Sequence, residues 1–197
     1  MGRNSFALAG VIGFAALVLL CACDIDVKKE ANGKDKQVNI STPVGGIHVS
    51  EQAQASDTGL PVYPGARLKQ DTDDGNDKSA NVDFSGFGFG IKVVALKYES
   101  DDPPDKIIEF YKDRLSKYGK VLECHISGHL GTNIDMDTDA SKNDKSNELT
   151  CTENHGSNIE LKVGKKDDQH IVAVESEGKG SNFSLVYVRT HGRNADI

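Results

Sequence analysis

The sequence predicts an α+β fold: an antiparallel β-sheet with one main amphipathic helix packed on a face, preceded by a short β-hairpin region. Three observations lead to this prediction. Residues 103–118 have helical periodicity, and segments with the alternation typical of strands lie on both sides of them. Short polar turns separate the last strand-like segments, which favours antiparallel neighbours because parallel strands need long crossovers.

The helix over residues 103–118 is the clearest element. Asp101 or Asp102 suits the N-cap, Pro103 suits the first helical position, and Gly119 suits a stop. One arc of about 100° on the helix is apolar. The residues predicted on it are Ile107, Ile108, Tyr111, Leu115 and Tyr118, with Phe110 at its edge. We expect this face to pack on the sheet.

Before the helix, residues 38–41 and 47–49 are predicted as two short strands of a hairpin. Residues 82–93 repeat part of that pattern. The identical residues are Val38 and Val82, Ser41 and Ser85, Gly46 and Gly90, Ile47 and Ile91, and Val49 and Val93. A duplicated hairpin and chance similarity between glycine-rich hairpins both explain this recurrence.

The remaining strands follow from alternation and turn residues. They are predicted at residues 82–84, 91–98, 121–124, 159–163, 171–174 and 183–188. The chain then divides into a signal peptide (1–22), a polar spacer with the short hairpin (23–58), an α+β domain (59–191) and a polar tail (192–197). Residues 52–58 are predicted to be a linker, and residues 127–147 an acidic, exposed insertion in the domain.

The amino terminus has the pattern of a secretory signal. Arg3 precedes an apolar run from Phe6 to Leu20, about 15 residues long, whereas a transmembrane helix needs about 20. The run ends in Leu20-Cys21-Ala22-Cys23, which resembles the lipobox of bacterial lipoproteins. That resemblance implies cleavage behind Ala22 and lipidation of Cys23. An uncleaved signal, or one cleaved without lipidation, is the alternative.

The lipobox resemblance also implies a location: anchored by lipid to the cell membrane and facing the periplasm. Asp24 resembles the inner-membrane retention signal of enteric bacteria and so favours the inner over the outer membrane.

Tyr63-Pro64-Gly65-Ala66 with the helix from Ile107 to Leu115 resembles a module of uncharacterised secreted or envelope bacterial proteins. This second resemblance extends over about residues 60–189 and implies no activity.

Two cysteines remain after the signal peptide and the lipidation site. Cys124 and Cys151 form an even pair in an oxidising compartment, which predicts a disulfide. It would close a loop of roughly 28 residues, for which chain entropy gives about 3 kcal/mol. A zinc site with His129 and His155 is the alternative, although the spacing matches no familiar zinc knuckle.

Asp135, Asp137 and Asp139 have the alternate spacing of a calcium-binding loop. The loop lacks the glycine and the glutamate of that motif, since Ala140 and Ser146 stand at the two positions. Residues 71–77 are similarly acidic and similarly imperfect. Solvated loops are the favoured interpretation, so no metal and no cofactor are predicted.

The composition excludes some functions. A net charge of -7 argues against nucleic-acid binding. His125 and His129 lack the intervening glutamate of a metalloprotease, and no serine lies in a nucleophile elbow, so no catalytic residue is assigned.

The predicted function is a membrane-anchored cell-envelope lipoprotein with a non-enzymatic interaction or structural domain and a possible envelope protein partner. A periplasmic small-ligand or cation-binding lipoprotein, with a site in the acidic loops or between helix and sheet, is the alternative.

Overall fold

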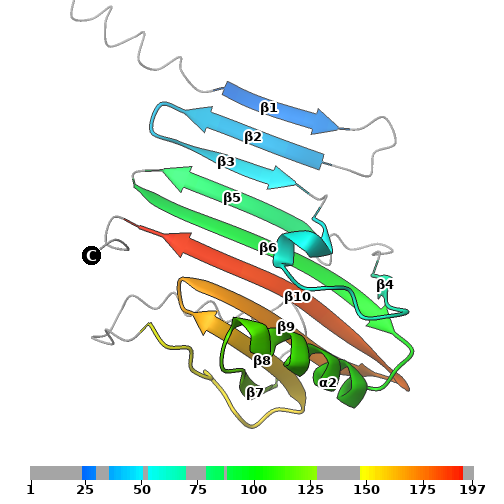
Figure 1. Cartoon of the computed structure of the whole chain (residues 1–197). Helices are drawn as coiled ribbons and strands as arrows, with labels where there is room; N and C mark the ends of the chain where they lie inside the picture. Colours follow the sequence, from blue (N-terminus) through cyan, green and yellow to red (C-terminus); the bar gives the residue numbers. More distant parts are fainter. Residues whose placement is uncertain are drawn as a thin grey trace, which may run out of the picture.

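The computed structural model describes residues 24–29, 36–50, 53–69, 79–86, 88–127 and 147–192. Ten strands of these residues form one antiparallel sheet in the order β1-β2-β3-β5-β6-β10-β9-β8-β7, and β4 pairs with β6 (Figure 1). The single α-helix of the described residues, α2, lies against this sheet. The α+β class is therefore confirmed, with sheet as the larger part.

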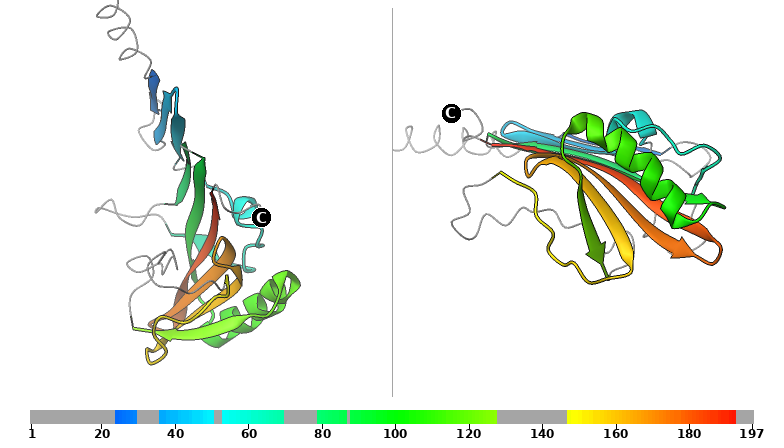
Figure 2. Two further views of the ribbon diagram at one scale, coloured as in Figure 1. Left: turned by 90° about the vertical axis from the view of Figure 1, so that its left-hand side faces the viewer. Right: turned by 60° about the horizontal axis from the view of Figure 1, so that its bottom comes forward.

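The strands are β1 (Asp24–Lys29), β2 (Lys36–Thr42), β3 (Gly45–Ser50), β4 (Arg67–Leu68), β5 (Ala80–Gly86), β6 (Phe89–Ser100), β7 (Leu122–Ile126), β8 (Asn158–Lys165), β9 (Asp168–Glu177) and β10 (Gly180–His191). The helices are the 3-10 turns η2 (Ala55–Thr58) and η3 (Ser116–Tyr118), and α2 (Pro104–Leu115). We call the side of the sheet that α2 covers the helix face, and the opposite side the back face (Figure 2).

The start of α2 differs from the prediction. Pro103, in an extended conformation, occupies the N-cap position, and Pro104 is the first helical residue. Asp102 therefore lies one residue too early to cap the helix. Its carboxylate instead accepts hydrogen bonds from Lys106 Nζ at 2.7 Å and from Tyr63 Oη at 2.9 Å. These two bonds connect α2 to the segment of residues 53–69.

The predicted apolar face of the helix is confirmed in its central part. Ile107, Tyr111 and Leu115 are fully buried against the sheet. Tyr118 is the exception, because it belongs to η3 and is 44% exposed. The 3-10 turn changes the periodicity after Leu115, so the ring of Tyr118 leaves the face on which an ideal α-helix would place it.

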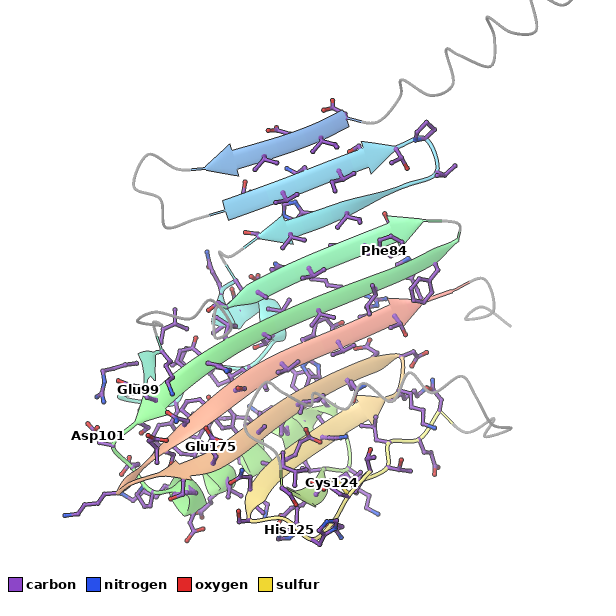
Figure 3. All side chains as sticks on the ribbon, turned by 180° about the vertical axis from the view of Figure 1, so that it is seen from behind. Phe84, Glu99, Asp101, Cys124, His125 and Glu175 are labelled. Atoms are coloured by element: carbon purple, nitrogen blue, oxygen red, sulfur yellow. A yellow bond between two sulfur atoms is a disulfide. The ribbon has the colours of Figure 1, made fainter. Side chains whose placement is uncertain are left out.

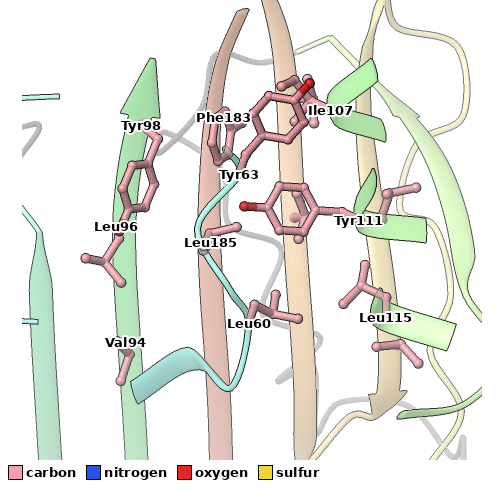
Figure 4. Close-up of a cluster of buried hydrophobic side chains, with 14 residues drawn as sticks. Leu60, Tyr63, Val94, Leu96, Tyr98, Ile107, Tyr111, Leu115, Phe183 and Leu185 are labelled. Atoms are coloured by element: carbon pink, nitrogen blue, oxygen red, sulfur yellow. The ribbon is translucent and has the colours of Figure 1, made fainter. Parts of the chain in front are cut away.

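The core lies between the helix face and two covering layers, α2 and residues 53–69 (Figure 4). Val94, Leu96 and Tyr98 alternate along β6 so that each faces this core, while residues between them face the back. Phe183 of β10 is fully buried at the centre. Its ring lies 5.4 Å from that of Tyr98 and 5.7 Å from that of Tyr111.

The segment predicted as a linker is ordered and partly buried. Residues 55–58 form η2, and Thr58 has no exposed surface. The segment continues across the core, where Tyr111 Oη donates a hydrogen bond to the Pro61 carbonyl oxygen at 3.1 Å. Tyr63-Pro64-Gly65-Ala66 then forms a turn closed by a bond from the Ala66 amide to the Tyr63 oxygen, with Gly65 at φ 78°.

The N-terminal strands belong to the same sheet rather than to a separate spacer. β3 pairs with β5, and β2 and β1 continue the sheet outward from there. They join because β2, β3 and β5 all place apolar residues on one side and polar residues on the other. In Figure 1 these strands extend beyond α2 as a single layer, which the described residues cover on neither side (Figure 3).

The recurring sequence pattern occupies equivalent positions in two consecutive strand pairs. Val38 pairs with Val49 between β2 and β3, and Val82 pairs with Val93 between β5 and β6. Ser41 with Gly46 and Ser85 with Gly90 are equivalent in the same way. The repeated residues therefore occupy the same register positions in the β2–β3 pair and in the β5–β6 pair.

Candidate functional site

A cleft of about 820 Å³ lies at one edge of the helix-covered layer. It lies between η2, η3 and the turn that joins β8 to β9. The residues that line it are Ser56, Asp57, Thr58, Gly59, Tyr118, Gly164, Lys165, Asp167, Asp168, His170 and Tyr187. Its size is that of a small-molecule site.

His170 is placed on the helix face of β9 and contacts two tyrosine rings. The ring centroids lie 4.0 Å from Tyr118 and 4.9 Å from Tyr187, the residue directly opposite on β10. Its Nδ1 is 2.8 Å from the carbonyl oxygen of Thr58. A carbonyl oxygen can only accept, so Nδ1 carries the proton and Nε2 keeps a lone pair in the neutral ring.

Burial lowers the pKa of His170 below its ordinary value of 6.5, and this effect exceeds the opposing influence of the Thr58 carbonyl and of Asp168. The imidazole is therefore neutral at pH 7. Two tyrosine rings and a neutral imidazole make this wall of the cleft aromatic and uncharged.

The segment from η2 closes over these rings at Gly59. Tyr118 Oη donates a hydrogen bond of 2.6 Å to the Gly59 carbonyl oxygen. Gly59 has φ 72°, and a Cβ atom there would lie 2.9 Å from Tyr118 Oη and 3.2 Å from His170 Cε1. Only glycine fits this position without displacing the rings.

The rim of the cleft is mainly acidic. Asp57, Asp167 and Asp168 line it together with a single basic residue, Lys165. The carboxylate of Asp57 accepts a hydrogen bond from the backbone amide of Gln54. The pKa of Tyr187 is raised, mainly by burial and to a smaller extent by the negative charge of Asp168. Carboxylates beside aromatic faces suit an organic cation, which ring quadrupoles attract. Within the described ranges, no group of three or more His, Cys, Asp or Glu side chains is arranged to hold a metal ion.

The predicted disulfide is present. Cys124 of β7 is bonded to Cys151, with 5.5 Å between the Cα atoms. The zinc alternative is wrong, because two sulfur atoms bonded to each other are not thiolate ligands. His155, its remaining described member, is a surface residue whose Nε2 lies 3.7 Å from Glu153.

Several predicted residues lie outside the described residues. They are Cys23 with the rest of the lipobox, His129, the acidic residues 71–77, and the calcium candidates Asp135, Asp137 and Asp139. The lipid anchor therefore stays a prediction, and so does the interpretation of these acidic residues as solvated loops.

Sequence reasoning did not find the cleft. His170 and Tyr187 meet only because β9 pairs with β10 in one particular register, and the alternation of each strand does not fix that register. Tyr118 gave a misleading signal, since its helical spacing assigned it to the core. The one usable signal was that His170 and Tyr187 stand at positions of β9 and β10 that face the helix side, where the other residues of these strands are mostly apolar.

No protein-family model, no curated protein and no solved structure matches this chain at a significant level. None of the helices in the described part of the chain combines the length and the apolar character needed to span a bilayer. The fold and the cleft thus define the chain as an α+β protein with one extended antiparallel sheet and one aromatic, acidic recess.

Proposed function

We propose that this chain is a bacterial cell-envelope lipoprotein, held in the membrane by acyl chains on Cys23, whose sheet domain serves as a non-enzymatic interaction module. The observation that carries the proposal is the sequence Leu20-Cys21-Ala22-Cys23 at the end of a short apolar run. The pairing of Cys124 with Cys151 supports it, because structural disulfides persist in oxidising compartments such as the periplasm.

Replacing the proposed acylation site removes the anchor. We expect the mature wild-type chain, extracted from native membranes, to have the intact mass of a chain that begins at an acylated Cys23. The Cys23→Ser variant is expected to lose that mass and to leave the membrane fraction, since two or more acyl chains are needed for stable anchoring. Cys21→Ser is the matched control, because Cys21 lies in the segment that is removed, and it should behave like wild type. An unacylated wild-type mass contradicts the proposal.

A second candidate function is supported by the cleft itself: binding of a small organic cation against the aromatic wall that Tyr118, His170 and Tyr187 form. The carboxylates on the rim and the neutral His170 make the recess attractive for positive charge. Envelope anchoring and ligand binding are compatible, and they are tested separately.

We expect a quaternary ammonium such as tetramethylammonium to raise the melting temperature at pH 7, and this effect to fade as the pH falls below about 6.5. The sign follows from the lowered pKa of His170: the imidazole is neutral at pH 7, and its protonation at lower pH puts a positive charge beside the ligand. His170→Gln should flatten the pH dependence, and Tyr118→Ala should remove the shift. The mostly exposed His155→Gln is the control. Equal shifts in wild type and Tyr118→Ala count against the site.

A further inference from the structure

The back face of the single-layer strands carries two apolar rows that run straight across the sheet, one residue from each strand. In the isoleucine row, successive register partners are Ile25, Ile40, Ile47, Phe84 and Ile91. In the valine row, they are Val27, Val38, Val49, Val82, Val93 and Val188. We refer to these two rows together as the apolar back face.

The acidic residues of these strands lie on the other side of the sheet. Asp24, Asp26 and Asp83 alternate with the apolar rows and so lie on the helix-face side, with Lys92 opposite Asp83. The apolar back face itself contains no acidic residue. Antiparallel sheets usually turn such a face toward a covering layer, and a contiguous exposed apolar patch marks an interaction site.

Exposure of the two rows increases toward β1. Val188, which packs with Ile171 and Val186 in a second buried cluster, is 1% exposed, whereas Val27 and Ile25 on β1 are 51% and 64% exposed. Side-chain sticks over β1 to β5 are open to view from behind in Figure 3, with no described segment crossing them. The most exposed part of the apolar back face is therefore the part nearest the N-terminal end of the described sheet.

The proposed acyl anchor meets the sheet at this same place. β1 begins at Asp24, and consecutive Cα atoms are about 3.8 Å apart, so Cys23 lies one residue from the edge strand. Asp24 pairs with Ser41 at the end of β2 next to the β2–β3 turn, where Val44 is 55% exposed. The β5–β6 turn follows at the same end, with Phe89 46% exposed. Four of the seven large, exposed hydrophobic side chains described thus lie on β1 or on the turns at this end of the sheet.

We propose that the apolar back face of β1, β2, β3 and β5 lies on the lipid bilayer, so that the sheet rests against the membrane next to its acylated Cys23. The inference depends on the lipid anchor of the proposed function. A tether of one residue keeps the face at high effective concentration next to the bilayer, so a modest apolar surface suffices for contact. The backbone groups of the inner strands are already paired within the sheet, and only side chains need to enter the interface.

The chain contains no tryptophan, so an introduced one is a clean fluorescence reporter. Val27→Trp places it on the apolar back face, and Ile25→Trp is a second position on the same strand and side. Ser41→Trp is the matched control. Ser41 pairs with Asp24 and is as close to the anchor, but it is exposed on the polar side. The lipidated mature chain, which begins at Cys23, is reconstituted in vesicles of phosphatidylcholine and phosphatidylglycerol, with or without brominated acyl chains.

We expect blue-shifted emission and at least about twofold stronger quenching by brominated lipid for Val27→Trp and Ile25→Trp than for Ser41→Trp, because only the back face reaches the acyl boundary. Equal quenching of all three overturns the proposal while the anchor stands. A blue shift without lipid quenching, together with a dimer captured by crosslinking, overturns it in favour of a second copy on this face. A chain that does not float with vesicles shows instead that the anchor of the proposed function is absent.

Discussion

Phe183→Ala is expected to destabilise the protein by about 3–5 kcal/mol, the range measured for fully buried aromatic residues replaced by alanine. Phe183 has no exposed surface, and its ring contacts three tyrosines: Tyr98 from β6, Tyr111 from α2 and Tyr63 from the crossing segment. Truncation therefore leaves a cavity where the sheet and both covering layers meet. The measurement is the free energy of unfolding from denaturant titration.

Phe89→Ala is the matched control, with the same chemical change at a side chain that is 46% exposed on the single-layer part of the sheet. We expect it to cost no more than about 0.5 kcal/mol, as surface substitutions do. If Phe183→Ala does not fold, Phe183→Leu keeps most of the volume and allows the comparison. Similar costs at positions 183 and 89 contradict a core centred on Phe183.

The sequence predicted those elements whose signal is local. The face of α2 could be read from the spacing of Ile107, Tyr111 and Leu115, because helical periodicity depends only on neighbouring residues. Strand alternation likewise identified most strands of the helix-covered layer. The pairing of Cys124 with Cys151 followed from counting cysteines once a secreted context had been inferred.

What the sequence did not reveal depends on register between distant segments. β3 joins β5 across residues 51–79, and that pairing turns an expected spacer hairpin into the outer half of one sheet. The rows of the apolar back face and the stack of Tyr118, His170 and Tyr187 arise from the same kind of pairing. A single strand shows which residues share a side, but not which strand lies beside it.

Removing the disulfide is the second change with a large expected effect. The pair Cys124 and Cys151 is separated by 27 residues, and closing such a loop restricts the unfolded chain by about 3–4 kcal/mol. Cys124 also lies on β7, the edge strand opposite to β1, whose one strand partner among the described residues is β8. The bond therefore attaches that edge to the segment before β8.

We expect the double variant Cys124→Ala with Cys151→Ala to unfold at lower denaturant concentration than wild type, with the free energy of unfolding reduced by about 3–4 kcal/mol. Reductant should bring wild type close to the same value and leave the double variant unchanged, which separates the bond from any packing change. Hydrogen exchange of the β7 amides should accelerate more than that of β9, because β9 is paired on both sides. If reductant does not shift the unfolding of wild type, the bond contributes nothing to stability, and the edge is held by the β7–β8 ladder and the core beneath it.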